Sequence, residues 1–180
     1  MNRWKIWVLR LNHRSKRDKR VTTHLLLAAR ALGVDGAFYS GEYDEKVEKS
    51  IEKVSKSWGG TFKVEFSHNW RQVVKEWKRN AGEVVHLTMY GLPVQDVIDQ
   101  LKASPKNKLI IVGGAKVPGV AYELADWNIS VTSQPHSEVS ALSIFLHELF
   151  EGHELPKQFE NAEKKVIPQA KGKKVVKTNK

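Results

Sequence analysis

The clearest structural signal in the chain is the stretch Leu109-Ile110-Ile111-Val112-Gly113-Gly114-Ala115-Lys116-Val117-Pro118. Its four apolar residues predict a fully buried strand, its two glycines a loop, and a helical pattern follows near residues 118–125. Strands that are buried on both faces are typical of parallel sheets with helices on either side. The stretch therefore predicts one strand–loop–helix unit of an α/β fold.

The same alternation of strands and helices extends along the chain in both directions. The expected strands are residues 4–11, 37–40, 62–66, 83–89, 109–112 and 129–132. The expected helices are residues 20–32, 44–58, 69–80, 94–103, 118–125 and 137–150. After Pro156 the pattern weakens, and residues 166–168 and 173–177 are expected to form a late β-hairpin. This order predicts an α/β fold whose mainly parallel sheet has helices on both faces.

Local signals refine two of the helices. Thr22 or Thr23 is expected to cap the first helix, and Gly33 is expected to end it. The second helix has one inward apolar face, made by Val47, Ile51, Val54 and Trp58. The six tryptophans are expected mainly to build the core rather than to stack on bases, with Trp4 and Trp127 left open.

Positive charge is concentrated at the two ends of the chain. The 180 residues carry a net charge of +10, of which residues 1–30 supply +8 and residues 164–180 supply +7, leaving −5 for the middle. Five of the seven residues 14–20 are cations, which repel one another unless an anion compensates them. The first cluster therefore predicts contact with an anionic polymer. The second cluster is explained equally well as a solvated tail.

Several protein classes are disfavoured. Without cysteine the chain has no disulfide, thiolate zinc site or cysteine nucleophile, which is consistent with a cytoplasmic protein. No apolar run is long enough to span a membrane, and Arg10 and Arg14 interrupt any signal peptide. The turn after the first strand lacks glycine and no Walker lysine motif occurs, which argues against nucleotide-binding Rossmann and P-loop proteins. The spacing of His147 and His153 does not match a zinc helix, so no metal site is expected.

Small and polar residues gather at three expected strand ends, in residues 86–91, 112–118 and 130–138. Ligands of open α/β sheets bind at the carboxyl ends of the strands, so these segments predict a binding site. Ser137 and Glu138 are placed to serve the first turn of the last helix. His24 is interpreted as a partly buried structural histidine rather than a catalytic one.

Three groups of motifs together carry a family resemblance. The first group is Leu9-Arg10-Leu11-Asn12-His13-Arg14, Arg17-Asp18-Lys19-Arg20 and Thr22-Thr23-His24. The others are Leu87-Thr88-Met89-Tyr90-Gly91 with residues 112–118, and residues 125–128 with Gln134-Pro135-His136-Ser137-Glu138-Val139. These motifs resemble the archaeal tRNA cytidine-56 ribose 2′-O-methyltransferases of the SPOUT class. The segment ending in residues 169–176 resembles the C-terminal extension of that family. One departure is Gly114-Ala115 before Lys116, where an acidic or other polar side chain is expected to be commoner.

The resemblance implies a trefoil knot near the C-terminal half, a homodimer and S-adenosylmethionine bound between its subunits. It implies a methyltransferase domain over residues 1–155 and a basic C-terminal extension over residues 156–180, with tRNA as the partner. By resemblance, the cofactor-binding residues are Leu87, Val112, Gly113, Gly114, Ala115, Lys116, Ser130, Val131, Thr132, Ser133, Gln134, Pro135, His136 and Ser137. The RNA-binding residues are expected to be Arg14, Lys16, Lys19, Lys171, Lys173 and Lys174.

The essential arginine implied by the resemblance is Arg17 or Arg20, with Arg20 preferred. Arginine is a poor base at its ordinary pKa, so a phosphate-clamping role fits it better. The proton of the ribose hydroxyl would then pass to a substrate phosphate or to His24. Two alternatives stay open at this stage: an RNA-binding α/β domain without catalysis, and a SPOUT methyltransferase that acts on a different RNA nucleotide.

Overall fold

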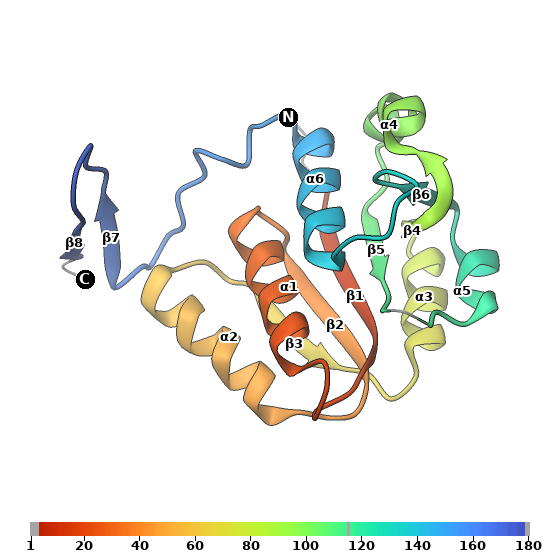
Figure 1. The fold of residues 1–180 in the computed structure, drawn as a ribbon, viewed down its shortest axis with the longest axis horizontal. Coiled ribbons are helices and arrows are strands. Elements are labelled where there is room, and N and C mark those ends of the chain that lie inside the picture. Colours follow the sequence, from red (N-terminus) through yellow and green to blue (C-terminus); the bar gives the residue numbers. More distant parts are fainter. Residues whose placement is uncertain (1–3, 115, 179–180) are drawn as a thin grey trace.

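The central feature of the computed structural model, which describes residues 4–114 and 116–178, is a six-stranded sheet (Figure 1). The strand order is β3-β2-β1-β5-β4-β6, and every neighbouring pair is parallel. The strands are β1 (Ile6–His13), β2 (Gly36–Gly41), β3 (Lys63–Phe66), β4 (Glu83–Pro93), β5 (Lys108–Val112) and β6 (Trp127–Ser130). The expectation of a mainly parallel sheet is confirmed.

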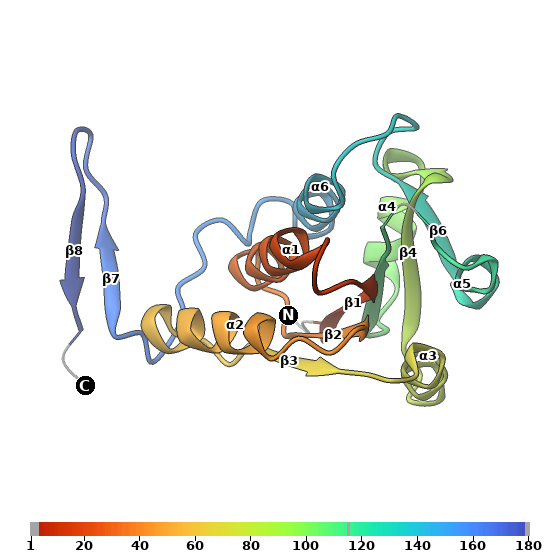
Figure 2. The ribbon, with the colours of Figure 1, turned by 60° about the horizontal axis from the view of Figure 1, so that its bottom comes forward.

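Helices cover both faces of this sheet (Figure 2). They are α1 (Lys19–Ala31), α2 (Glu45–Trp58), α3 (Trp70–Arg79), α4 (Val94–Ala103), α5 (Gly119–Leu124) and α6 (Glu138–Phe150). Side chains of α1, α2, α4 and α6 belong to one buried cluster, and those of α3 and α5 to a second. Strand β5 serves both clusters, because Ile110 and Val112 enter the first whereas Leu109 and Ile111 enter the second.

Strand β4 crosses the end of β6 at very short range. Its register with β6 breaks after Leu87, so that both Leu87 and Leu92 pair with Ile129. A Cβ atom on Gly91 would lie 2.4 Å from the carbonyl carbon of Asn128, a separation that no side chain tolerates. Glycine at this position therefore permits residues 88–91 to leave the regular pairing and return close to the backbone of β6, where Leu92 and Pro93 pair again.

The expected C-terminal hairpin is present, with slightly different bounds. Strands β7 (Lys164–Ile167) and β8 (Lys174–Lys177) pair antiparallel in a sheet of their own. The hairpin lies beside the end of α2, and both views place it at the opposite side of the molecule from β4 and β6 (Figures 1 and 2).

Some local expectations were wrong. Neither threonine caps α1: Asp18 occupies the N-cap position, and Thr22 is buried with its hydroxyl against His13 Nδ1 at 2.9 Å. Strand β6 ends at Ser130 rather than residue 132, since Thr132 has a left-handed φ of +63° that does not fit a strand.

The inward face of α2 is also shorter than expected. Val47 and Ile51 are buried in the core, but Trp58 in the last turn is 36% exposed. The sheet has ended by this point and the C-terminal segment only partly covers the indole. Within the described residues, no helix combines the length and the apolar character that a membrane span requires.

Candidate active site

A cavity of about 370 Å³ opens beside the irregular part of β4 and the carboxyl ends of β5 and β6, and we call it the strand-end cavity. Residues 86–90 of β4 and the loops after β5 and β6 form it, and these are the segments in which the small and polar residues gather. Its lining comprises His86, Leu87, Thr88, Met89, Tyr90, Val112, Gly113, Gly114, Val117, Tyr122, Val131, Thr132, Gln134, Pro135, His136, Ser137, Glu138 and Ala141.

One wall of this cavity is held by a buried polar chain. His86 Nδ1 lies 2.9 Å from Asn128 Oδ1, and the His86 ring meets the Tyr122 ring edge-on at 4.6 Å. The Tyr122 hydroxyl is in turn 3.1 Å from Thr88 Oγ1. Burial lowers the pKa of His86, so the imidazole is neutral near pH 7 and serves to fix the irregular part of β4 that begins at Thr88.

The loop between β6 and α6 is fixed by His136. Its Nε2 lies 2.6 Å from the Val131 carbonyl oxygen, which only accepts hydrogen bonds, so Nε2 donates. Nδ1 lies 3.0 Å from the Ser140 hydroxyl oxygen and 3.1 Å from the Ser137 carbonyl oxygen, to which the Ser140 hydroxyl donates at 2.8 Å. The Ser137 hydroxyl oxygen accepts from the backbone N–H of Val139, which caps α6 as expected. This loop is thus pre-organised by its own side chains.

Arg10 is a buried cation beneath the same site. It is 1% exposed, and its Nη2 lies 3.7 Å from Oε1 of Glu138, which lines the cavity. Its Nε and Nη1 have no hydrogen-bond partner among the described residues. Burial lowers the pKa of Arg10, and the charge of Glu138 acts in the opposite direction. The guanidinium also lies close to the place that a Cβ on Gly114 would occupy, 3.5 Å from Nη2.

A second cavity, of about 480 Å³, adjoins the first at Gly114, and we call it the loop cavity. The basic loop after β1 forms much of its wall. The lining comprises Asn12, His13, Arg14, Arg17, Asp18, Gly41, Glu42, Gly114 and Lys116. A substrate in the loop cavity would therefore be separated from a ligand in the strand-end cavity only by the glycine turn.

Internal contacts hold the basic loop in shape. Arg14 donates two hydrogen bonds to the carboxylate of Asp18, at 2.7 and 3.1 Å. These bonds lower the pKa of Asp18. Glu42 accepts from the backbone N–H of Ser15 at 2.8 Å and from its hydroxyl, and the pKa of Glu42 is lowered in consequence. Arg17, by contrast, is exposed on the cavity wall.

The structure brings together most of the expected cofactor residues. The strand-end cavity is lined by Leu87, Val112, Gly113, Gly114, Val131, Thr132, Gln134, Pro135, His136 and Ser137. Lys116 lines the loop cavity instead, Ser130 is buried at the end of β6, and Ser133 is exposed outside the lining. Ala115 lies outside the described residues.

The expected RNA and catalytic residues are more scattered. Arg14 and Arg17 line the loop cavity, whereas Arg20 and His24 are exposed on α1 and line neither cavity. His24 is therefore not the partly buried histidine that was expected. Lys16 is exposed on the basic loop, and the side chain of Lys19 is not described. Exposed positions in the C-terminal hairpin, far from both cavities, are occupied by Lys171, Lys173 and Lys174.

The sequence analysis assigned no role to Arg10 or Tyr122, and it placed His86, Thr88 and Glu138 only within segments expected to form a binding site. A signal for Arg10 was present, because it is a cation inside an otherwise apolar strand. The cluster of His86, Thr88 and Tyr122 joins β4 to α5, and no local pattern reveals such a contact. Among the described residues, no group of three or more metal-ligating side chains occurs.

The fold is that of the SpoU-type RNA methyltransferases. The Aquifex aeolicus TrmH/SpoU tRNA modifying enzyme is similar with a TM-score of 0.62 at 18% identity, over 84% of this chain and 77% of that one. AviRb from Streptomyces viridochromogenes, a SpoU methyltransferase solved in complex with AdoMet, gives a TM-score of 0.61 at 18% identity, over 83% of this chain and 58% of that one.

Sequence comparison identifies the family within that class. The family model for tRNA ribose 2′-O-methyltransferase, aTrm56, matches residues 58–176. A tRNA (cytidine(56)-2′-O)-methyltransferase of Methanothermobacter thermautotrophicus is 53% identical over 92% of this chain and 93% of its own length. One of Pyrococcus horikoshii is 56% identical over 95% of this chain and 84% of its own length. The chain belongs to the tRNA ribose 2′-O-methyltransferase family aTrm56.

Proposed function

We propose that this chain transfers a methyl group from S-adenosylmethionine to the ribose 2′-hydroxyl of cytidine 56 in tRNA. The observation that carries the proposal is the pair of adjoining cavities at the strand ends, one with a buried apolar wall and a fixed polar loop, the other lined by the basic loop. Relatives at 53% and 56% identity are named for this reaction. Two adjoining sites suit a transfer between a small donor and a polyanionic acceptor.

The strand-end cavity fits the donor in size and chemistry. Its 370 Å³ lies within the range of small-molecule sites, and Leu87, Val112 and Val131 give it a buried apolar wall for an adenine ring. The turn at Gly113 and Gly114 lets backbone approach a ligand closely. When bound, S-adenosylmethionine supplies an electrophilic methyl group on a sulfonium. We assign donor binding to Leu87, residues 112–114, Val131, Thr132 and residues 134–137, which line this cavity.

The loop cavity is assigned to the RNA. Arg17 is exposed on its wall and Lys116 borders it, so both cations can meet phosphate oxygens. Because Arg20 lines neither cavity, we now prefer Arg17 as the phosphate clamp. His24 is likewise outside both linings, so we assign removal of the hydroxyl proton to a substrate phosphate.

Arg10 is proposed as a positioning residue. Its charge faces Glu138 across 3.7 Å, and its guanidinium lies under the Gly114 turn, where the two cavities meet. The ion pair would hold the Glu138 carboxylate at the rim of the donor site and keep the turn in place. Arg10 itself is buried and would act through these neighbours rather than on the substrate.

We further propose a homodimer, a trefoil knot in the C-terminal half and a cytoplasmic location. Residues 1–155 would form the methyltransferase domain and residues 156–180 its extension. Self-association is supported by large apolar side chains that are exposed on β4 beside the strand-end cavity. Tyr90 is 78% exposed and Leu92 is 56% exposed. Sedimentation velocity of the purified chain would test this, and a monomer at micromolar concentration would contradict it.

Isothermal titration calorimetry with S-adenosylmethionine tests the proposed function. One donor molecule should bind per chain, while ATP, which shares the adenosine group but lacks the sulfonium, should bind far more weakly. A folded protein that shows no binding of S-adenosylmethionine would refute the proposal and favour RNA binding without catalysis.

A further inference from the structure

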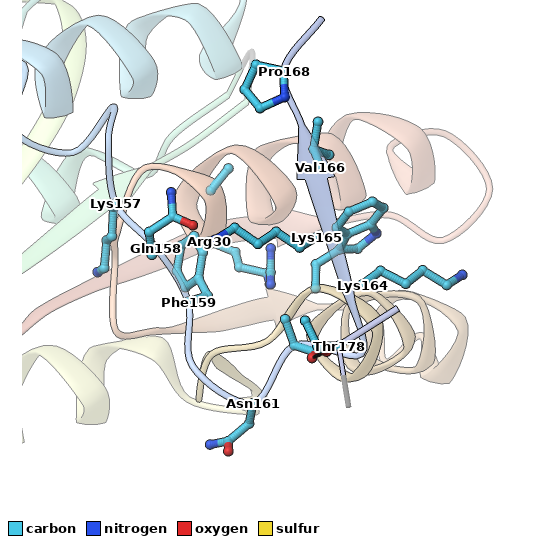
Figure 3. A pocket seen from close by; sticks show the side chains of 13 residues that line it. Arg30, Lys157, Gln158, Phe159, Asn161, Lys164, Lys165, Val166, Pro168 and Thr178 are labelled. Atoms are coloured by element: carbon cyan, nitrogen blue, oxygen red, sulfur yellow. Dashed lines mark hydrogen bonds between the residues drawn. The ribbon is translucent and has the colours of Figure 1, made fainter. Parts of the chain in front are cut away.

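A groove of about 770 Å³ lies between the C-terminal hairpin and the ends of α1 and α2, and we call it the hairpin groove (Figure 3). It is lined by Arg30, Ala31, Trp58, Lys157, Gln158, Phe159, Asn161, Ala162, Lys164, Lys165, Val166, Pro168 and Thr178. None of these residues lines either cavity of the candidate active site. The groove is thus a separate feature on the opposite side of the chain from β4 and β6 (Figure 1).

The groove is built on fixed contacts. The backbone N–H of Gly60 donates to the Glu160 carbonyl at 2.8 Å, and that of Glu163 donates to the Ser57 carbonyl at 3.1 Å. Arg30 forms part of the floor, because its guanidinium donates to the Gly59 carbonyl and lies 4.9 Å from the Phe159 ring centre. The base of the hairpin is therefore tied to the end of α2.

The charge of the groove is of one sign. Its lining contains four cations and no carboxylate among the described residues. Lys164 pairs directly with Lys177 across the hairpin, an arrangement of like charges that destabilises a two-stranded sheet. No acidic residue occurs from Lys164 to the end of the chain. Lys164 and Lys165 are both exposed, so their charges are available to an external anion.

Trp58 adds an aromatic surface to this cationic groove. It belongs to neither buried cluster and is 36% exposed, although it lies at the end of the apolar face of α2. An exposed indole between cations is the combination that non-sequence-specific RNA sites use, since bases stack on the ring while cations hold the phosphates. A purely structural tryptophan would be expected to be covered by its neighbours.

We infer that the hairpin groove binds a segment of the tRNA remote from the nucleotide that is methylated. Lys164 and Lys165 would contact phosphates, and Trp58 would stack on an unpaired base. This inference rests on the proposed function, and it adds a second RNA surface to the loop cavity. Because the groove is distant from the donor site of its own chain, it would add tRNA affinity without changing the chemical step.

The test uses the full chain with Lys164→Gln and Lys165→Gln combined, and separately with Trp58→Ala and Trp58→Phe. The matched control is Lys46→Gln with Lys53→Gln, which removes the same charge from exposed positions of α2 outside the groove. Dissociation constants for unmodified tRNA would be measured across a salt series. Donor binding and turnover at saturating tRNA would be followed in parallel.

The groove variant should bind tRNA about tenfold more weakly and reduce the slope of log K against log salt by about 1.4, for two lost phosphate contacts. Trp58→Ala should weaken binding by about tenfold, and Trp58→Phe should restore most of it. Donor affinity and turnover at saturating tRNA should be unchanged in all of them.

If Lys46→Gln with Lys53→Gln weakened tRNA binding as much as the groove variant does, the effect would be one of general charge and the inference would be overturned. So would normal tRNA affinity in the groove variants, including the case in which they alter only the self-association of the chain. Absence of methyl transfer by the unaltered protein would instead refute the proposed function, because tRNA affinity is measured without it.

Discussion

Replacing Arg10 by methionine separates the stability of the fold from its activity. The side chain is buried, and two of its nitrogen atoms have no partner among the described residues. Methionine fills a similar volume without charge. Glu138 would lose its cation, but its side chain is 29% exposed and so remains hydrated.

The expected change in stability is small, because opposing contributions are similar in size. Two buried guanidinium nitrogens without partners, Nε and Nη1, cost about 2–6 kcal/mol together. The attraction between Arg10 and Glu138, whose nearest atoms are 3.7 Å apart, offsets about 4 kcal/mol of that cost at an effective dielectric constant of about 20. The free energy of unfolding of Arg10→Met should therefore lie within about 2 kcal/mol of the original value. Methyl transfer should fall about 10²-fold, since the rim of the donor site is no longer held in place.

Urea unfolding and single-turnover methyl transfer would measure the two effects. Glu138→Gln should show a similar loss of rate, and the double variant should be little worse than either single one, because both substitutions break one ion pair. A destabilisation of more than about 3 kcal/mol in Arg10→Met, or normal turnover by a folded variant, would refute this reasoning.

Three further predictions follow from local geometry. Gly91→Ala should weaken S-adenosylmethionine binding about tenfold or more in calorimetry, because its Cβ would meet backbone at 2.4 Å, whereas Gly119→Ala, with nothing within 4 Å, should not. Leu142→Ala should lower the free energy of unfolding by about 2–5 kcal/mol in urea titrations, since the side chain is fully buried. Arg14→Gln should destabilise the protein near neutral pH, because Arg14 lowers the folded-state pKa of Asp18. The stabilisation is lost as the pH falls through this lowered pKa, so the two proteins should be equally stable at pH values below it. The last prediction would be contradicted if the free energies of unfolding of Arg14→Gln and the original protein differed by the same amount at neutral pH and below the pKa of Asp18.

The order of elements was predictable because it depends on local periodicity. The fully apolar run at Leu109–Val112 correctly predicted a central parallel strand, and the glycines after it correctly predicted a loop that lines a cavity. That the three segments of small and polar residues meet around one cavity was predicted by the same reasoning, since parallel strands end at one edge of the sheet, although β4 and β6 end at other residues than expected.

The features that local patterns did not predict depend on contacts between residues far apart in the sequence. Trp58 has the spacing of a core residue, but the sheet no longer lies beneath it, so its indole is partly exposed. Which of Arg17 and Arg20 is essential stays a prediction, and the motif does not reveal that Arg17 lines a cavity whereas Arg20 does not. The pairing of Arg10 with Glu138 joins β1 to α6 across the fold, and neither local pattern contains that information.

Mapping the modified nucleotide tests the central claim most directly. Unmodified tRNA would be incubated with the protein and S-adenosylmethionine, then digested and sequenced by mass spectrometry. We predict a single added methyl group on the ribose of cytidine 56. A methyl group on a base or on another nucleotide, or unmodified RNA in the presence of folded protein that binds the donor, would contradict this account.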